Sequence, residues 1–309
     1  MTRATLMDIL KGSVATVALF LAYLSLPLIG VIGGVLAPLP AIVSTFRSGR
    51  AAGIIIIVLS AAVFAALVEP PFVVFYLLQS ASISLLVPLL LPGRRTSQAV
   101  VLSAAVSISL IAAAGLAIAG FGGISPDAAV SKWITESSIQ TSALYARIGF
   151  SGEDLKALQQ GLQQFIAVFS QAYPALIVIT QTTAVMLNVL AFSGIARRRQ
   201  LPVAIGDFCQ FRNPEQLIWL LILAGFAMLV PNQVVERAAL NLLLVLLFAY
   251  LIQGLAVMLH FFDRMAIPAV GRYFFYFFLV LQPYLLVGVV VLGIFDLWGN
   301  FRSPRKQNL

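Results

Sequence analysis

Side chains able to do chemistry are scarce in this sequence. A single histidine, His260, cannot provide a catalytic zinc held by several histidines, and a single cysteine, Cys209, cannot form a disulfide within the chain. The sequence also lacks the Gly-x-x-x-x-Gly-Lys-Ser/Thr loop that holds nucleotide phosphates and the Gly-x-Ser-x-Gly turn that presents a nucleophilic serine. We therefore expect no enzyme, no metal site and no cofactor.

The remaining candidates are neutral polar residues inside apolar stretches. Gln181 and Asn188 are seven positions apart, so they share one face of a helix. Such side chains can join neighbouring helices by hydrogen bonds, or they can line an uncharged cavity for a small neutral or aromatic ligand. The sequence leaves both interpretations open. Under the second, the candidate ligand-binding residues are Gln79, Gln171, Tyr173, Gln181, Asn188 and Gln253.

Ionisable residues lie near the ends of apolar stretches. His260 precedes Asp263 by three positions and is either a pH switch or an interfacial residue in contact with water and headgroups. Asp296 lies beside an interfacial tryptophan, and Arg302, six residues later, is a candidate partner for its carboxylate. No Asp, Glu, Lys or Arg lies in the middle of a predicted span, which argues against a proton-coupled carrier.

Composition places these residues in a membrane. The chain is 61% hydrophobic and 10% charged, with a mean hydropathy of +1.02, whereas soluble domains carry about 25% charged residues. A lipid bilayer can accommodate this excess of apolar residues. We therefore predict an all-α, polytopic bundle forming one transmembrane domain over residues 1–309. The net charge of +8 comes from arginines clustered between apolar runs, which indicates topology rather than nucleic-acid binding.

Apolar runs of about 20 residues predict about nine spans, with a range of about eight to ten. Residues 12–46 contain several prolines and glycines, and we expect them to form two helices with a break between them. Residues 121–160 form a water-facing insert, and Ser151-Gly152-Glu153-Asp154 predicts the start of a helix that continues through Pro174 to Arg199. The other predicted spans cover residues 52–68, 72–91, 98–120, 216–231, 238–260 and 273–298.

Basic residues predict the orientation of the spans. Successive clusters, from Arg3 with Lys11 to Arg264 with Arg272, are separated by two spans each, so all fall on the cytoplasmic side and the insert falls outside. A single last span would then place the basic tail outside, whereas Lys and Arg in short loops usually lie on the cytoplasmic side, the positive-inside rule. The alternative is a break at Gln282-Pro283 that turns the last segment into a short hairpin.

Small residues near the amino terminus are candidates for close helix contact. Glycine and alanine at helical spacing let two backbones approach, either within this bundle or against another membrane protein. The candidate helix-contact residues are Ala18, Ala22, Gly30, Gly33 and Gly34.

Several longer stretches carry a family resemblance. They are Gln253-Gly254-Leu255-Ala256-Val257, Pro268 with Arg272, Gly293-Ile294-Phe295-Asp296-Leu297-Trp298 with Phe301-Arg302, Phe211-Arg212-x-Pro214 with Trp219, Tyr173-Pro174, and Pro38-Leu39-Pro40. With them the chain resembles the YybS-like family of uncharacterised membrane proteins, domain of unknown function 2232. That family is distantly similar to the substrate-binding subunits of energy-coupling-factor transporters, which typically have six spans, and to a membrane component of rod-shape machinery.

Two functions follow as expectations. The first is a small-molecule-binding membrane subunit of a transporter, without its own ATPase, in a bacterial inner membrane. Its partners would be the lipid bilayer, an ATPase module and a small neutral ligand. The alternative is a non-catalytic scaffold for cell-envelope or cell-shape assembly, which would bind other membrane proteins. A cavity beside the long helix around Gln181 and Asn188 would favour the first, and a solid, alanine-packed centre the second.

Overall fold

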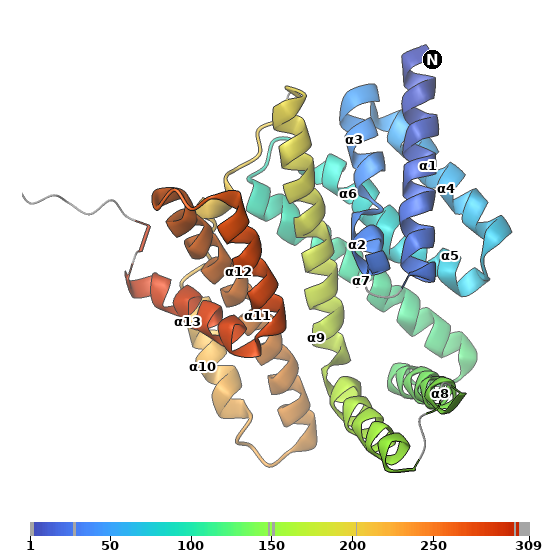
Figure 1. The fold of residues 1–309 in the computed structure, drawn as a ribbon, viewed down its shortest axis with the longest axis vertical. Coiled ribbons are helices and arrows are strands. Elements are labelled where there is room, and N and C mark those ends of the chain that lie inside the picture. Colours follow the sequence, from blue (N-terminus) through green and yellow to red (C-terminus); the bar gives the residue numbers. More distant parts are fainter. Residues whose placement is uncertain are drawn as a thin grey trace, which may run out of the picture. The chain divides into compact units, whose positions relative to one another are not determined.

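The computed structural model describes residues 3–26, 29–147, 149, 152–201, 203–299 and 301–302 (Figure 1). Every regular element within these ranges is helical, as predicted. The chain divides into two compact units. Unit 1 contains residues 1–156 and 177–205, and unit 2 contains residues 157–176 and 206–309. The long helix α9 (Gly152–Arg198) therefore contributes residues to both.

Unit 1 begins with the predicted broken pair. Helix α1 (Arg3–Ser25) is followed by α2 (Ile29–Leu36) and α3 (Leu39–Ser48), while Pro27 and Leu28 lie outside the described residues. Arg47 near the end of α3 forms an ion pair with Asp8 near the start of α1, at 3.2 Å. The start of α1 and the end of α3 are therefore neighbours (Figure 1), and two antiparallel segments occupy this stretch.

The other helices of unit 1 follow the apolar runs closely. A core of buried apolar side chains, including Ile42, Ile83, Val87, Val185 and Phe192, joins α3, α6, α7 and the second half of α9. The bounds are α4 (Arg50–Leu67), α5 (Pro70–Tyr76), a π-helical turn η1 (Leu77–Ala81), α6 (Ser82–Leu90), α7 (Thr96–Gly122) and α8 (Pro126–Arg147).

Helix α9 confirms the prediction of one very long helix. It has 47 residues and contains Pro174, which at ~1.5 Å per residue gives roughly 70 Å, against a hydrocarbon core of about 30 Å. Glu153 and Asp154 lie in its first turn, where the helix dipole favours acids. Ser151, the predicted cap, lies outside the described residues.

Unit 2 contains a helical hairpin and a bent helix pair. Asn232 caps the second hairpin helix, its side chain accepting hydrogen bonds from the backbone N–H groups of Val234 and Val235 at 3.0 and 3.3 Å. The later pair meets at 108° around Gln282, so the predicted break at Gln282-Pro283 is present. The bounds are η2 (Phe208–Gln210), α10 (Leu217–Ala227), α11 (Gln233–Arg264), α12 (Ala269–Leu281) and α13 (Pro283–Gly299).

Fewer helices can cross a membrane than simple counting suggested. Within the described ranges, 7 helices are long and apolar enough, or up to 8 if the bent pair is one span. Two of the predicted spans account for the difference. Helix α10 has only 11 residues, and the run 273–298 is interrupted by a proline, which lacks the N–H that would continue the helix.

The residues that follow α13 lie near the end of α11, where Asp263 and Arg272 form an ion pair. Arg302 donates hydrogen bonds to the carbonyl oxygens of Cys209 and Phe211 at 2.9 and 2.7 Å. Cys209 in turn lies 3.6 Å from the Asp263 carboxylate, which pairs with Arg272 at 2.7 Å. Arg302 therefore lies at the same end of unit 2 as Arg272.

Candidate functional site

Gln181 joins three helical segments of unit 1. Its side-chain amide donates to the Ser107 hydroxyl on α7 and to the Gln79 carbonyl oxygen in η1, the latter at 3.5 Å. The Ser107 hydroxyl also shares a hydrogen bond of 2.6 Å with Ser82 on α6. Gln181, Ser82 and Ser107 are all buried. Gln79 thus takes part through its backbone carbonyl, and Gln181 acts as a contact between helices.

Asn188 lies on the same face of α9 as Gln181, two helical turns later, and its side chain binds the end of the short helix α2. Its amide nitrogen donates to the Val35 carbonyl oxygen at 2.7 Å and to the Ala184 carbonyl oxygen at 2.8 Å, and the side chain is fully buried. Val35 lies in the last turn of α2, where carbonyl groups have no partner within the helix. Asn188 therefore supplies a donor that α2 itself cannot.

In unit 2, helix α11 completes the hydrogen bonding that Pro174 interrupts in α9. Proline lacks an N–H, so the carbonyl oxygen of Ser170, four residues earlier, loses its helical donor. Arg237 donates to that oxygen at 3.3 Å, and its guanidinium lies 5.6 Å from the centre of the Tyr173 ring. Sequence reasoning missed Arg237, although a proline inside an expected helix was the signal that a donor was needed.

Asn241 bridges the next pair of backbone groups on α9. Its side-chain oxygen accepts from the Ala175 N–H and its nitrogen donates to the Gln171 carbonyl oxygen, both at 2.8 Å. These two groups are four residues apart and would be partners in a regular helix. Gln171 thus contributes its backbone carbonyl group to the contact, and the residue as a whole is exposed.

The most polar interior contact of unit 2 surrounds Asp296. Its carboxylate is fully buried, accepts from the Gln253 amide at 3.0 Å and forms an ion pair with Arg302 at 2.5 Å. The Gln253 side-chain oxygen accepts from the Asn213 N–H at 3.1 Å. The structure thus confirms Arg302 as the partner of Asp296. Asp263, the neighbour of His260, instead pairs with Arg272.

Four of the predicted helix-contact residues, Ala22, Gly30, Gly33 and Gly34, lie where α1 meets α2. A side chain at Gly30 would overlap the Ala22 carbonyl oxygen, and one at Gly33 would overlap the Leu19 carbonyl oxygen and touch Ala22. Gly34 faces the ring of Tyr23 in the same way. Their contacts are thus internal to unit 1. Ala18 is exposed and remains a candidate for contact with another protein.

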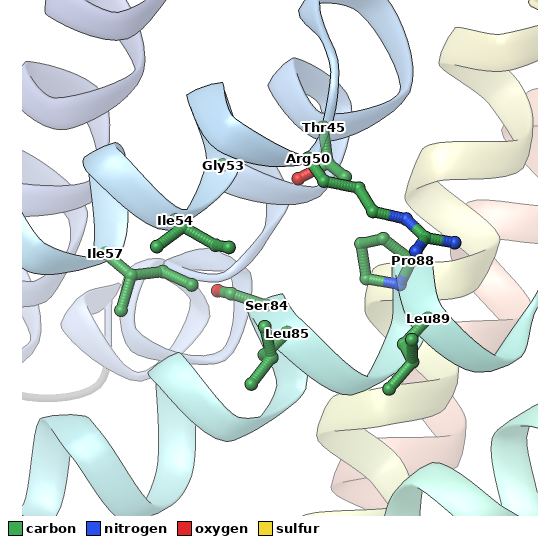
Figure 2. A pocket seen from close by; sticks show the side chains of 9 residues that line it. All are labelled: Thr45, Arg50, Gly53, Ile54, Ile57, Ser84, Leu85, Pro88 and Leu89. Carbon is green, nitrogen blue, oxygen red and sulfur yellow. The ribbon is translucent and has the colours of Figure 1, made fainter.

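One small groove lies between α4 and α6. It has a volume of about 170 Å³ and apolar walls that include Ile54, Ile57 and Leu85. Figure 2 shows the Arg50 side chain reaching across its upper side toward Pro88. Ligand pockets usually measure about 300–1,000 Å³, and none of the predicted ligand-binding residues lines this groove.

Comparison with known proteins places the chain in a family. The family described as "Predicted membrane protein (DUF2232)" matches residues 14–297. The chain belongs to this family. No curated protein and no solved structure matches the chain. The DUF2232 protein is thus a multi-pass membrane protein, in agreement with the resemblance that the stretches around Gly254 and Gly293 carry.

The predicted ligand-binding residues of this DUF2232 protein fall into two groups. One group belongs to unit 1 and the other to unit 2. In each, the contacts observed are hydrogen bonds or a cation–π contact with a neighbouring helix, as expected if these residues join helices. Ligand binding by these residues stays a prediction. The groups are Gln79, Gln181 and Asn188 in unit 1, and Gln171, Tyr173 and Gln253 in unit 2.

Proposed function

We propose that this protein is a non-catalytic membrane scaffold of the bacterial inner membrane that acts by binding other membrane proteins. The observation that supports it best is the engagement of the polar side chains of α9. The amides of Gln181 and Asn188 already donate to neighbouring helices. A ligand could use these donors only by breaking contacts that hold the helices together.

Packing around the second half of α9 supports the same proposal. Ala184, Val185 and Phe192 are at most 1% exposed and belong to one apolar cluster with Ile83 and Val87. The ring of Phe192 also stacks on that of Phe46 at 4.6 Å. This is the alanine-containing, filled centre expected of a scaffold.

The first half of α9 offers a surface for a partner. If the basic end of α9 lies at the cytoplasmic interface, about 20 residues cross the hydrocarbon core and the preceding residues project from the other side. Phe165 and Val168 lie there and are 56% and 66% exposed. They are three positions apart and share a face of the helix. Exposed apolar side chains outside the bilayer favour protein contact.

Site-specific photo-crosslinking tests the scaffold. A photoreactive residue at Phe165 should give discrete adducts with one or a few membrane proteins. The matched control is Leu110, an exposed apolar residue of α7 within a predicted span, which should give lipid adducts. Deletion of the protein should disturb cell shape or envelope integrity without an uptake defect. Lipid adducts alone at both positions, with normal morphology, would contradict the proposal.

The second candidate is a small-molecule-binding subunit that relies on the ATPase module of another protein. A set of buried hydroxyls in unit 1 favours it. The hydroxyl oxygens of Thr16 and Ser80 have no hydrogen-bond partner within the described part of the chain, those of Ser60 and Tyr76 lie beside each other, and all four residues are at most 1% exposed. Tyr76 and Ser80 flank or lie in the π-helical turn, a feature frequent at functional sites. Neutral hydroxyls suit a neutral ligand.

Native mass spectrometry of the purified protein separates the two candidates. A retained small molecule that is lost in Tyr76→Phe, and kept in Tyr284→Phe, would favour ligand binding. Tyr284 is the matched control because it is 86% exposed. Recovery of an ATPase module in mild detergent would favour the same candidate. Absence of both, together with protein adducts at Phe165, would leave the scaffold.

A further inference from the structure

Basic residues gather at one end of unit 1, around a groove formed by three chain segments. Phe46 comes from the last turn of α3, Leu91 to Arg95 from the turn between α6 and α7, and Val203 with Ala204 from the segment after α9. The groove has a volume of about 640 Å³, within the range of about 300–1,000 Å³ that is usual for ligand sites. We call it the basic groove.

The basic groove has an apolar floor and a cationic rim. The Phe46 ring, stacked on buried Phe192, and the side chain of Leu91 form the floor. Arg94 and Arg95 are exposed at the rim, and neither forms an ion pair within the described residues. One side of a bound molecule would therefore meet hydrocarbon and the other would meet two guanidinium groups.

Neighbouring charges strengthen the positive field. A second groove of about 310 Å³ shares Val203 and Ala204 with the first and adds Arg197 to the same region. Of the acidic residues of unit 1, Asp8 is the one near this end, and it already pairs with Arg47 at 3.2 Å and accepts from Ser48 at 2.6 Å. Among the described acidic residues of unit 1, none forms an ion pair with Arg94 or Arg95.

We propose that the basic groove is a binding site for the phosphate headgroup of an anionic phospholipid, with acyl carbons against Phe46 and Leu91. Arginine forks match phosphate oxygens in pairs. Basic pockets between helices at the cytoplasmic face are suited to anionic headgroups. A soluble phosphate compound shares the anionic chemistry but leaves the apolar floor uncovered, so the lipid fits the whole groove. This site is independent of the scaffold proposed above.

Lipid titration with paired variants tests the site. The full-length protein is placed in nanodiscs of phosphatidylcholine with increasing phosphatidylglycerol, and lipids retained after gentle release are measured by native mass spectrometry. Arg94→Gln with Arg95→Gln should weaken phosphatidylglycerol retention at least about 10-fold, since a hydrogen bond from arginine to a charged phosphate contributes about 1.5–3 kcal/mol. Arg198→Gln with Arg199→Gln removes equal charge outside both grooves and should change retention less than about threefold.

A steric variant keeps the test independent of charge. Ala204→Trp should fill the groove and reduce retention with every arginine present, because Ala204 is exposed and lines the groove. Equal losses in the two arginine pairs would overturn the proposal, since binding would then reflect general attraction to the leaflet. Full displacement of the lipid by millimolar inorganic phosphate, or equal retention of phosphatidylcholine, would also overturn it.

Discussion

The Asp296 carboxylate and the Gln253 amide are joined by a hydrogen bond of 3.0 Å between helices α13 and α11, and both side chains are fully buried. Gln253 uses its oxygen as well, accepting from the Asn213 N–H. One side chain thus connects the loop before α10, the middle of α11 and the end of α13. This contact places Arg302, and with it the end of the described chain, against the rest of unit 2.

Replacement of Asp296 by Asn should destabilise unit 2. It would leave the Arg302 guanidinium, whose side chain is 9% exposed, without its buried counter-charge, at a cost of about 3–5 kcal/mol. Arg302→Gln should cost less, because Arg212, at 3.9 Å from the Asp296 carboxylate, remains as a counter-charge. The double variant should be more stable than the sum of the two losses predicts, because neither charge is then left alone. Thermal unfolding of the two single variants and the double variant in detergent gives the coupling energy of the pair. Strict additivity of the two losses would show that the pair is not coupled.

Replacement of Gly293 by Ala should separate α13 from α11. An added methyl group would overlap the Tyr250 carbonyl oxygen, and overpacking of this kind costs about 1–3 kcal/mol. Gly288→Ala, in the same helix, is the matched control because nothing lies within 4 Å of its added carbon. It should be neutral or stabilising, since alanine is the better helix former. Equal melting temperatures for the two variants would contradict the close contact.

Replacement of Gln181 by Leu should weaken unit 1 by about 1 kcal/mol, the usual size of a hydrogen bond between membrane helices. It removes the donor to Ser107 and Gln79 while keeping a similar volume. Ser109→Ala is the control, because that exposed hydroxyl donates to the Ala105 carbonyl oxygen of its own helix. A loss of ligand retention without any loss of stability would instead favour the ligand-binding interpretation of Gln181.

The Cys209 thiol should react slowly at neutral pH. Burial, followed by the carboxylates of Asp207 and Asp263, raises the pKa of the thiol to about 11. Only the thiolate is nucleophilic, so alkylation should accelerate with pH up to about 11. Asp263→Asn removes one negative neighbour, lowers the pKa and should increase the rate at pH 9. Cys209 is the chain's one cysteine, so mass spectrometry follows a single site. A rate already at its plateau by pH 9 would contradict the raised pKa.

Much of the fold is readable from local composition. Apolar runs of about 20 residues demand a membrane wherever they occur, so most helices begin and end near the expected positions. The break before α2 was also predictable, because glycines and prolines cluster there. The same reasoning failed for α10 and for the run 273–298. Both are apolar enough for a span, yet one helix stops at Ala227 and the other breaks at Gln282.

For the site residues, too, some properties follow from local sequence and others do not. The sequence alone determined that this is an all-helical membrane protein with neutral polar side chains in its spans, because hydropathy and residue type are local properties. Only the tertiary structure decided their partners: Asn241 and Arg237 for the backbone around Pro174, Ser107 for Gln181, and Asp296 for Gln253. Each pair joins helices far apart in the chain, and which helices pack together depends on the whole bundle rather than on any one segment.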